Sequence, residues 1–174
     1  IVSYLLSRLD IKTTPIGAEI IPGLELYGCY TREEVFTLVG RQTAEVKMQG
    51  TASGAFNLPE HNAVLLFVTL NKSEKDFSPS TQYNDYLIND EYFHWQSKNT
   101  DSHYNSGGRK YIEQPKTGIK IILFVREEKK DGFGNTSPFH CFGLVDYVSS
   151  HDDFPMNVKW KLQKPAMAQY LKAI

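Results

Sequence analysis

The stretch Phe93-His94-Trp95-Gln96-Ser97-Lys98-Asn99 brings two large aromatic rings, an imidazole, an amide and a hydroxyl group into one short run. Period-2 alternation predicts a strand, with Tyr92, His94 and Gln96 on one face and Phe93, Trp95 and Ser97 on the other. Flat rings beside hydrogen-bonding groups on both faces suit a planar ligand that is stacked and read along its edge. An aromatic core strand with internally satisfied polar groups would have the same composition.

Outward from this run, the sequence predicts further strands. Ala63 to Leu70 is a short apolar run rich in β-branched and aromatic residues, which is typical of a strand buried on both faces. Three more are predicted after the central run, at Ile119–Arg126, Phe139–Ser149 and Phe154–Leu162. The last alternates clearly, with Met156, Val158, Trp160 and Leu162 inward. Lys47 to Gly50 is a weaker candidate for an edge strand.

The predicted helices are few and short. Thr31 to Val39 begins with a capping box of Thr31 and Glu34 and ends before Gly40. Further helices are expected at 109–113 and 166–174, whereas 83–89 reads as either a helix or a turn. Strands and helices do not alternate regularly, which argues against a doubly wound parallel sheet. The expected class is α+β, as a small, mostly antiparallel β-barrel with a few short helices.

Length and composition bound the domain organisation. The 174 residues fit one domain, residues 24–174, preceded by a helix and connector over residues 1–23. The chain opens on Ile1 in what reads as the middle of a helix, so we expect an excised C-terminal piece of a larger protein. No apolar run is long enough to span a membrane. Cys29 and Cys141 lie far apart, which favours a reducing, cytoplasmic location over a secreted one.

Motifs of enzyme chemistry are missing from the sequence. It contains no GxSxG, GxxxxGK[ST], HExxH or glycine fingerprint after a strand. The five histidines are scattered, with no carboxylate partner at a telling spacing and no set of ligands that would close a zinc site. We therefore expect no catalytic residues, no metal and no cofactor in this chain, and favour a binding module.

Positive charge gathers around the central run although the net charge of the chain is only −1. With Tyr104 and Tyr111 interleaved, these side chains are candidates for a surface that follows a phosphate backbone. They are Lys98, Arg109, Lys110, Lys116, Lys120, Arg126, Lys129 and Lys130. The polar, glycine-bearing loop 100–108, with Ser102 and Tyr104, is expected to be mobile enough to close over a ligand.

Several motifs together resemble one family. They are Tyr83-x-Asp85-Tyr86, the 93–99 run with its Asn99, Leu123-Phe124-Val125-Arg126-Glu127, Pro138-Phe139, Gly143, Pro155-Met156 and Trp160-x-Leu162. The chain is similar to the C-terminal domain of bacterial superfamily II helicases, often found beside a phospholipase-D-type nuclease, and in particular to that of ATP-dependent type IV restriction enzymes. Lys98 departs from the pattern, because relatives are expected to carry glutamine there.

The resemblance implies an SRA-like, PUA-related barrel that recognises 5-methylcytosine or 5-hydroxymethylcytosine in double-stranded DNA by base flipping. It also implies helicase and nuclease domains in the same polypeptide, serving bacterial defence. The implied base pocket comprises Tyr92, Phe93, His94, Trp95, Gln96, Ser97, Asn99 and Asp101. The implied backbone or loop contacts are Lys98, Ser102, Tyr104, Arg109, Lys110 and Arg126. Two alternatives stay open: a reader of phosphorothioate or another DNA modification, and a coupler of helicase and nuclease that does not bind DNA.

Overall fold

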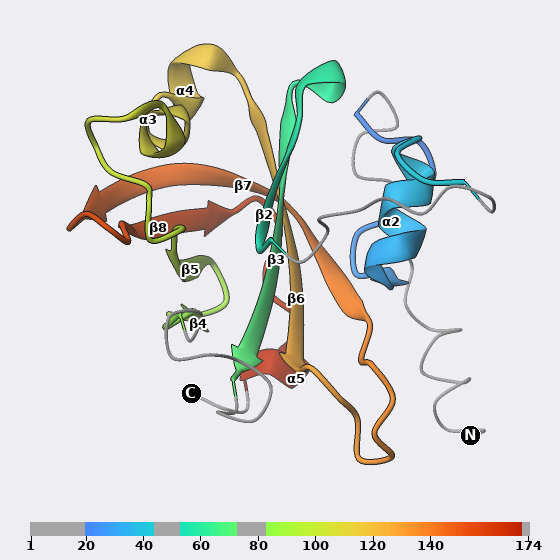
Figure 1. The fold of residues 1–174 in the computed structure, drawn as a ribbon. Helices are drawn as coiled ribbons and strands as arrows, with labels where there is room; N and C mark the ends of the chain where they lie inside the picture. Colours follow the sequence, from blue (N-terminus) through green and yellow to red (C-terminus); the bar gives the residue numbers. More distant parts are fainter. Residues whose placement is uncertain (1–19, 44–52, 73–82, 172–174) are drawn as a thin grey trace.

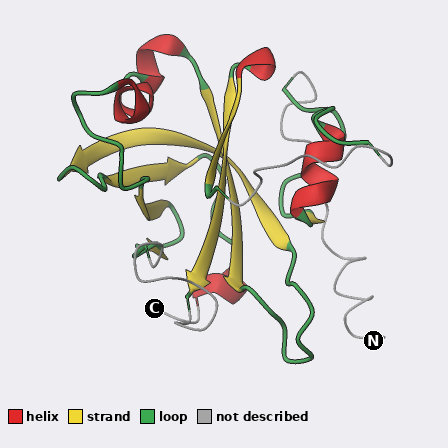
Figure 2. Ribbon diagram, in the orientation of Figure 1, coloured by secondary structure: helices red, strands yellow, loops and turns green. Residues whose placement is uncertain are grey.

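The computed structural model describes residues 20–43, 53–72 and 83–171 (Figure 1). The strands are β1 (Cys29–Tyr30), β2 (Ala55–Leu58), β3 (Ala63–Asn71), β4 (Tyr86–Leu87), β5 (Tyr92–Gln96), β6 (Lys120–Glu128), β7 (Phe139–His151) and β8 (Asn157–Leu162). The helices are α2 (Arg32–Leu38), the 3-10 turn η1 (Pro59–His61), α3 (Ser106–Ile112), α4 (Gln114–Thr117) and α5 (Ala168–Leu171). In Figure 2 the strands cross in the middle of the molecule and the helices lie around them.

The strands form one eight-stranded sheet in the order β2-β3-β6-β7-β8-β5-β4, with β1 paired to β7 beside this path. All neighbours are antiparallel except β3 and β6, where Ala63 pairs with Lys120 and Val68 with Val125 in parallel. The predicted α+β class and the mostly antiparallel sheet are confirmed.

The predicted barrel is not shown. The sheet path ends at β2 and β4, and no pairing joins these two strands within the residues that the structure describes. β4 has only two residues, so few backbone hydrogen bonds could join this edge to another strand and close a barrel. Irregular register on both sides of β7 bends the sheet instead: Leu123 pairs with Gly143 but Phe124 with Cys141, which leaves Phe142 as an extra residue.

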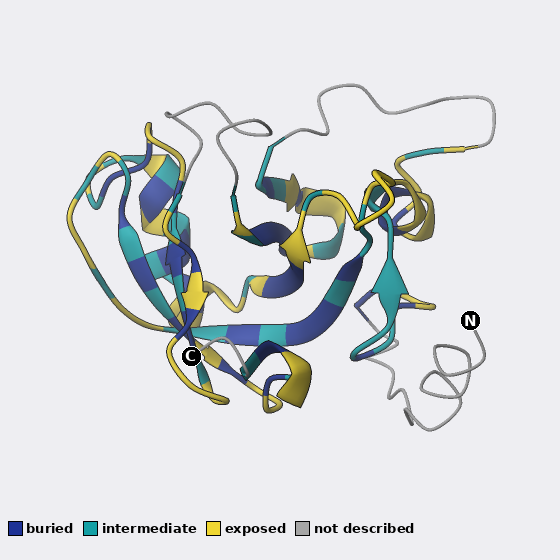
Figure 3. Ribbon diagram, turned by 90° about the horizontal axis from the view of Figure 1, so that it is seen from below, coloured by how far each residue is buried: buried dark blue, intermediate teal, exposed yellow. Residues whose placement is uncertain are grey.

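Two hydrophobic clusters lie on opposite faces of β3 and β6. The tryptophan core contains Trp95, Trp160, Leu66 and the other inward residues of β5 and β8. The phenylalanine core contains Phe36 of α2 together with Leu65, Phe67 and Phe124. β3 is therefore buried on both faces, as its continuous apolar run predicts. Buried and less buried residues alternate along other strands, such as β5 and β8 (Figure 3).

Most element predictions are confirmed with shifted ends. In α2, the Thr31 side chain accepts a hydrogen bond from the Glu34 N–H, and the Glu34 carboxylate accepts one from the Thr31 N–H. α3 begins at Ser106, earlier than predicted, because the Asn105 side chain caps it by accepting from the Gly108 N–H. Residues 83–89 were predicted to form a helix or a turn. They contain the short strand β4 instead, since Tyr86–Leu87 pairs with β5.

Some predictions fall outside the described residues. These are the helix in residues 1–23, the edge strand at 47–50 and residues 172–174 of the terminal helix, whose first part is α5. Among the helices of the described ranges, none is long and apolar enough to cross a membrane.

Candidate functional site: an aromatic cluster with unpartnered polar atoms

Strand β5 divides the predicted site residues between two faces. Phe93, Trp95 and Ser97 are buried, whereas Tyr92, His94 and Gln96 are partly exposed. The predicted alternation is confirmed. The two sets therefore face different surroundings and cannot line a single pocket from one strand.

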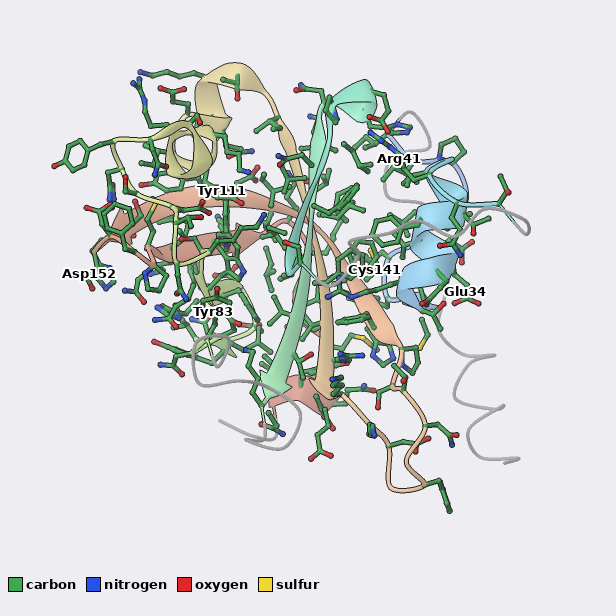
Figure 4. The ribbon with its side chains drawn as sticks, in the orientation of Figure 1. Glu34, Arg41, Tyr83, Tyr111, Cys141 and Asp152 are labelled. Atoms are coloured by element: carbon green, nitrogen blue, oxygen red, sulfur yellow. The ribbon has the colours of Figure 1, made fainter. Side chains whose placement is uncertain are left out.

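On the inner face, aromatic rings from the sheet and from α3 pack together. The Tyr111 ring of α3 meets the Trp95 ring edge-on at a centroid distance of 5.0 Å and the Trp160 ring at 5.9 Å. Tyr147 of β7 lies edge-on to Trp160 at 6.2 Å. We call these four residues the aromatic cluster. Figure 4 labels Tyr111, which lies between α3 and the strands below it.

Three buried polar atoms have no hydrogen-bond partner among the described residues: Tyr111 OH and Trp160 Nε1 in this cluster, and Oδ2 of Asp101, whose carboxyl group acts on the pKa of Tyr111. Tyr111 and Trp160 are fully buried and Asp101 is 5% exposed. A buried polar group without a partner typically costs about 1–3 kcal/mol, and more when it is charged. Such groups are uncommon in folded proteins, so these three make the cluster a candidate binding site.

The Asp101 carboxyl group affects the pKa values of two α3 residues, Tyr111 and Lys110. Burial raises the pKa of the Tyr111 hydroxyl, and the nearby Asp101 carboxyl raises it further, so the phenol stays protonated and can donate. Burial lowers the pKa of Lys110, whereas Asp101 acts in the opposite direction and raises it. The Lys110 ammonium donates to Asn57 Oδ1 at 3.0 Å and lies 4.8 Å from the centroid of the Tyr111 ring. A cation thus stands beside the buried carboxyl group.

The loop that leads into α3 is held by hydrogen bonds. Asn105 receives bonds at Oδ1 from the Ser102 and Gly108 N–H groups and donates from Nδ2 to Thr100 O. The Asp101 carbonyl accepts from the Phe154 N–H at 3.0 Å, and Ser102 is 2% exposed. This bonding differs from the expectation of a loop free to close over a ligand.

Two glycines permit the close approach of α3 to this loop. A Cβ on Gly107 would lie 2.5 Å from Asp101 Oδ1, and one on Gly108 would lie 2.1 Å from the Ser102 carbonyl oxygen. Glycine at both positions is what places the first turn of α3 against Asp101 and Ser102.

A hydrogen-bonded chain links this loop to β7. His103 Nδ1 donates to Asp153 Oδ1 at 2.9 Å, and His103 Nε2 lies 2.8 Å from Ser150 Oγ. Ser150 Oγ in turn lies 2.8 Å from the Tyr147 hydroxyl. No carboxylate lies at a telling sequence spacing from any histidine, yet the fold brings Asp153 to His103. The partners are 47 and 50 residues away in sequence, so no local spacing signals them.

Ser97 and Arg126 have structural partners. Ser97 Oγ accepts from the Met156 N–H and donates to the Lys98 carbonyl, which joins the end of β5 to β8. Arg126 is 8% exposed, donates to Thr69 Oγ1 and Ser137 O, and packs over the Phe139 ring at 4.2 Å. These contacts place Arg126 within the fold rather than on an open surface.

The other predicted contact residues are at the surface. Lys98 and Asn99 are exposed, and the Tyr104 ring is 87% exposed. Arg109 forms an ion pair with Glu113 at 2.6 Å. Tyr104, Arg109 and Lys110 contribute to a surface hollow of about 520 Å³ on α3. No group of three or more histidine, cysteine or acidic side chains suited to a metal ion occurs in the described parts of the chain.

On the outer face, β5 carries a different arrangement. The His94 ring stacks on Tyr86 with centroids 4.5 Å apart, and its Nδ1 donates to Asn84 O. The Gln96 amide donates to Asn157 Oδ1 and accepts from the Asn84 N–H. The Tyr92 ring lies 4.4 Å from the Lys159 ammonium.

The family model for the domain of unknown function DUF3427 matches residues 24–173. The chain belongs to the DUF3427 family. No curated protein matches the sequence of this DUF3427 domain.

Among solved structures, the DUF3427 domain is similar to the 5-hydroxymethylcytosine-specific restriction enzyme AbaSI, with 15% sequence identity and a TM-score of 0.43. The match covers 93% of this chain and 49% of the AbaSI chain. The chain thus spans about half the length of that enzyme.

Proposed function

We propose that this DUF3427 domain is a DNA-binding target-recognition module that holds a flipped, modified cytosine against the aromatic cluster. One observation carries the proposal: Tyr111 OH and Trp160 Nε1 in a cluster of edge-to-face rings, and the nearby Asp101 Oδ2, are buried polar atoms without partners among the described residues. A planar, apolar-faced ligand with a polar edge would satisfy all of them.

Cytosine has an edge that suits these atoms. Its exocyclic amine is a donor that the Asp101 carboxyl oxygen can accept, and its ring nitrogen and carbonyl are acceptors for the Tyr111 hydroxyl. An indole N–H is a donor only, so Trp160 can serve a second acceptor, including the oxygen of a hydroxymethyl group. Enzymes and readers that act on a single base extrude it from the duplex and bind its edge and its faces in this way.

Entry of a base requires α3 to move. Trp95 and Tyr111 contact each other edge to face, and all three unpartnered atoms are buried. Trp95 and Trp160 lie on paired strands, where Phe93 is opposite Trp160 and Trp95 opposite Val158, whereas Tyr111 lies on the short helix α3. We infer that α3 shifts away from the sheet when the base enters, since β5 and β8 are held to each other by strand pairing whereas α3 is not part of the sheet.

The resemblance of the sequence motifs extends the proposal to the whole protein. The similarity to the target-recognition domain of the type IV restriction enzyme SauUSI supports a role within an ATP-dependent, modification-directed endonuclease. In that arrangement the helicase and nuclease domains of the same polypeptide perform the chemistry, and this domain selects the DNA.

Binding to matched duplexes tests the proposal. Duplexes that differ only in cytosine, 5-methylcytosine or 5-hydroxymethylcytosine at one position are titrated with the domain, and affinity is measured by fluorescence anisotropy. We expect at least a tenfold preference for a modified duplex. Equal affinity for all three duplexes would overturn the proposal that the domain recognises modified cytosine. A preference for phosphorothioate duplexes in the same titration would support the backbone-modification alternative. No DNA binding at all would support the coupler.

Base extrusion is tested separately. 2-Aminopurine placed beside the modified cytosine becomes more fluorescent when its neighbour leaves the stack. We expect a rise that saturates with binding of the modified duplex and is absent with the unmodified one. Tight, modification-specific binding without a rise would contradict flipping and favour recognition in the major groove.

A further inference from the structure

The outer face of β4, β5 and β8 presents a row-by-row arrangement of rings, amides and lysines. Tyr86 is opposite His94, and His94 is opposite Lys159. The next rows pair Tyr92 with Lys161 and Gln96 with Asn157. Because directly opposite residues point to the same side of a sheet, these seven side chains share one face. We call them the outer face; it lies on the side of β5 away from the aromatic cluster.

The rings of the outer face are held in place and remain accessible. Tyr86 is 44% exposed and lies nearly parallel to the His94 ring, with an interplanar angle of 14°. The hydrogen bond from His94 Nδ1 to Asn84 O fixes the imidazole, and the Lys159 ammonium lies over Tyr92. Fixed rings lose little conformational freedom when a flat ligand stacks on them.

The charged side chains among these seven residues are Lys159 and Lys161, although the exposed Asp152 carboxylate accepts a hydrogen bond from Asn157 of this face. Lys159 is partly exposed and Lys161 is exposed. Asp85 is directed inward, to Lys72 Nζ at 2.7 Å and the Gln96 N–H. Asp146 is opposite Lys161 across β7, and its carboxylate accepts from the Gln114 and Gln163 amides. Glu91, one residue before β5, is exposed and is in alternation with Phe93 and Trp95 rather than with the outer face.

We propose that the outer face binds an unpaired DNA strand, with bases stacked on Tyr86 and Tyr92 and phosphates beside Lys159 and Lys161. Aromatic platforms combined with cationic side chains are the usual means of binding single strands. A duplex hides the faces of its bases, so exposed rings favour an unpaired strand. The choice of DNA over RNA rests on the function proposed above, but the surface itself is separate from the base-binding site.

The test measures binding of fluorescent twelve-nucleotide oligo-dT to the whole chain. Replacing both lysines by glutamate, K159E/K161E, should lower the affinity at least tenfold. It should also reduce the magnitude of the slope of log affinity against log salt concentration by roughly 1.4, because each lost phosphate contact of a single strand removes about 0.7. The control is R41E, which reverses an exposed charge just after α2, on the other side of the molecule from β4, β5 and β8 (Figure 4), and should bind oligo-dT like the wild type.

The contribution of the rings is tested by Tyr86→Ala. Loss of one stacked base should lower oligo-dT affinity roughly fivefold or more. Circular dichroism and tryptophan fluorescence establish that each variant is folded; if K159E/K161E unfolds, K159Q/K161Q replaces it with the same expectation at a smaller magnitude. Asp101→Asn should leave oligo-dT binding unchanged while it weakens modified-duplex binding, which keeps the two proposals distinguishable.

Three results would overturn the inference. They are no oligo-dT binding at low salt, equal losses in K159E/K161E and R41E, and wild-type affinity in K159E/K161E. Tighter binding of oligo-rU than of oligo-dT would overturn the assignment to DNA.

Discussion

Asp101 is a buried acidic residue whose carboxyl group lacks a hydrogen-bond partner at one oxygen among the residues that the structure describes. Its Oδ2 atom is buried without a described partner, although a hydrogen bond to a charged group is worth about 1.5–3 kcal/mol. Asp101→Asn should therefore lower the affinity for the modified duplex roughly tenfold or more. Stability should stay the same or rise, because a neutral amide costs less to bury than a carboxylate.

The control for Asp101 is Asp90→Asn, which changes an exposed carboxylate in the turn before β5. It should alter neither binding nor the free energy of unfolding. Anisotropy titrations and urea unfolding measure both quantities. If Asp101→Asn still discriminates between modified and unmodified duplexes as the wild type does, the Asp101 carboxyl group does not take part in recognition of the base.

Trp95 is a core residue of the fold as well as a predicted site residue. It is 4% exposed and contacts both Tyr111 and Trp160. Trp95→Ala should therefore cost about 3–5 kcal/mol of stability, as for other large core aromatic residues. Urea unfolding followed by circular dichroism measures this loss, with Phe154→Ala at a 60% exposed position as the control. A loss below about 1 kcal/mol would instead place Trp95 at an open site.

At the scale of elements, the contact between α3 and the loop before it depends on Gly108. Alanine would add about 1 kcal/mol of helix propensity, but its Cβ would lie 2.1 Å from a backbone oxygen and 2.3 Å from Met156 Sδ. The clash with backbone should dominate, so Gly108→Ala should lower the melting temperature. Gly132→Ala, with no atom within 4 Å of the new Cβ, should not. A stabilised Gly108→Ala would contradict the close packing of α3.

The contact between His103 and Asp153 predicts a pH dependence. Hydrogen bonds from the His103 side chain and backbone hold the pKa of Asp153 below its ordinary value of 3.8. A folded pKa below the unfolded one means that the stabilisation is present above pH 3.8 and is lost as the pH falls through the folded pKa. Asp153→Asn should thus be less stable than the wild type near neutral pH, and the difference should vanish in acid. A difference that persists at pH 2 would contradict this assignment.

Elements with a local signal were predictable, and contacts between them were not. The alternation in β5 and β8 and the capping box of α2 are read directly from neighbouring residues. The start of α3 was missed because two glycines suggest a loop, whereas their role is to let Asn105 cap a closely packed helix. Trp160 entered the candidate site only through tertiary packing, since the sequence does not specify which strand adjoins β5. Tyr111 was expected at a phosphate-following surface, but it is fully buried in the aromatic cluster.

At the scale of the whole molecule, β3 couples the two cores. Leu65 and Leu66 are adjacent and fully buried, yet Leu65 packs in the phenylalanine core and Leu66 in the tryptophan core. Alanine at either position should cost about 2–5 kcal/mol. Because both tryptophans of the chain lie in the tryptophan core, fluorescence reports on that side alone.

If the molecule unfolds as one unit, Leu65→Ala should shift the fluorescence transition as much as the circular dichroism transition. Leu66→Ala is the matched variant on the other face of the same strand. Separate transitions in Leu65→Ala would show that the two cores unfold independently.

The pairing of β5 also bears on how the chain is synthesised and folded. Its long partner, β8, comes near the end of the chain, and β3 must await β6 for its parallel neighbour. Such distant pairings raise contact order and slow folding. Until residues 157–162 leave the ribosome, Phe93 and Trp95 have only the two-residue β4 beside their strand. A nascent or truncated chain that ends before β8 would therefore expose Phe93 and Trp95 to solvent, which makes it prone to aggregation.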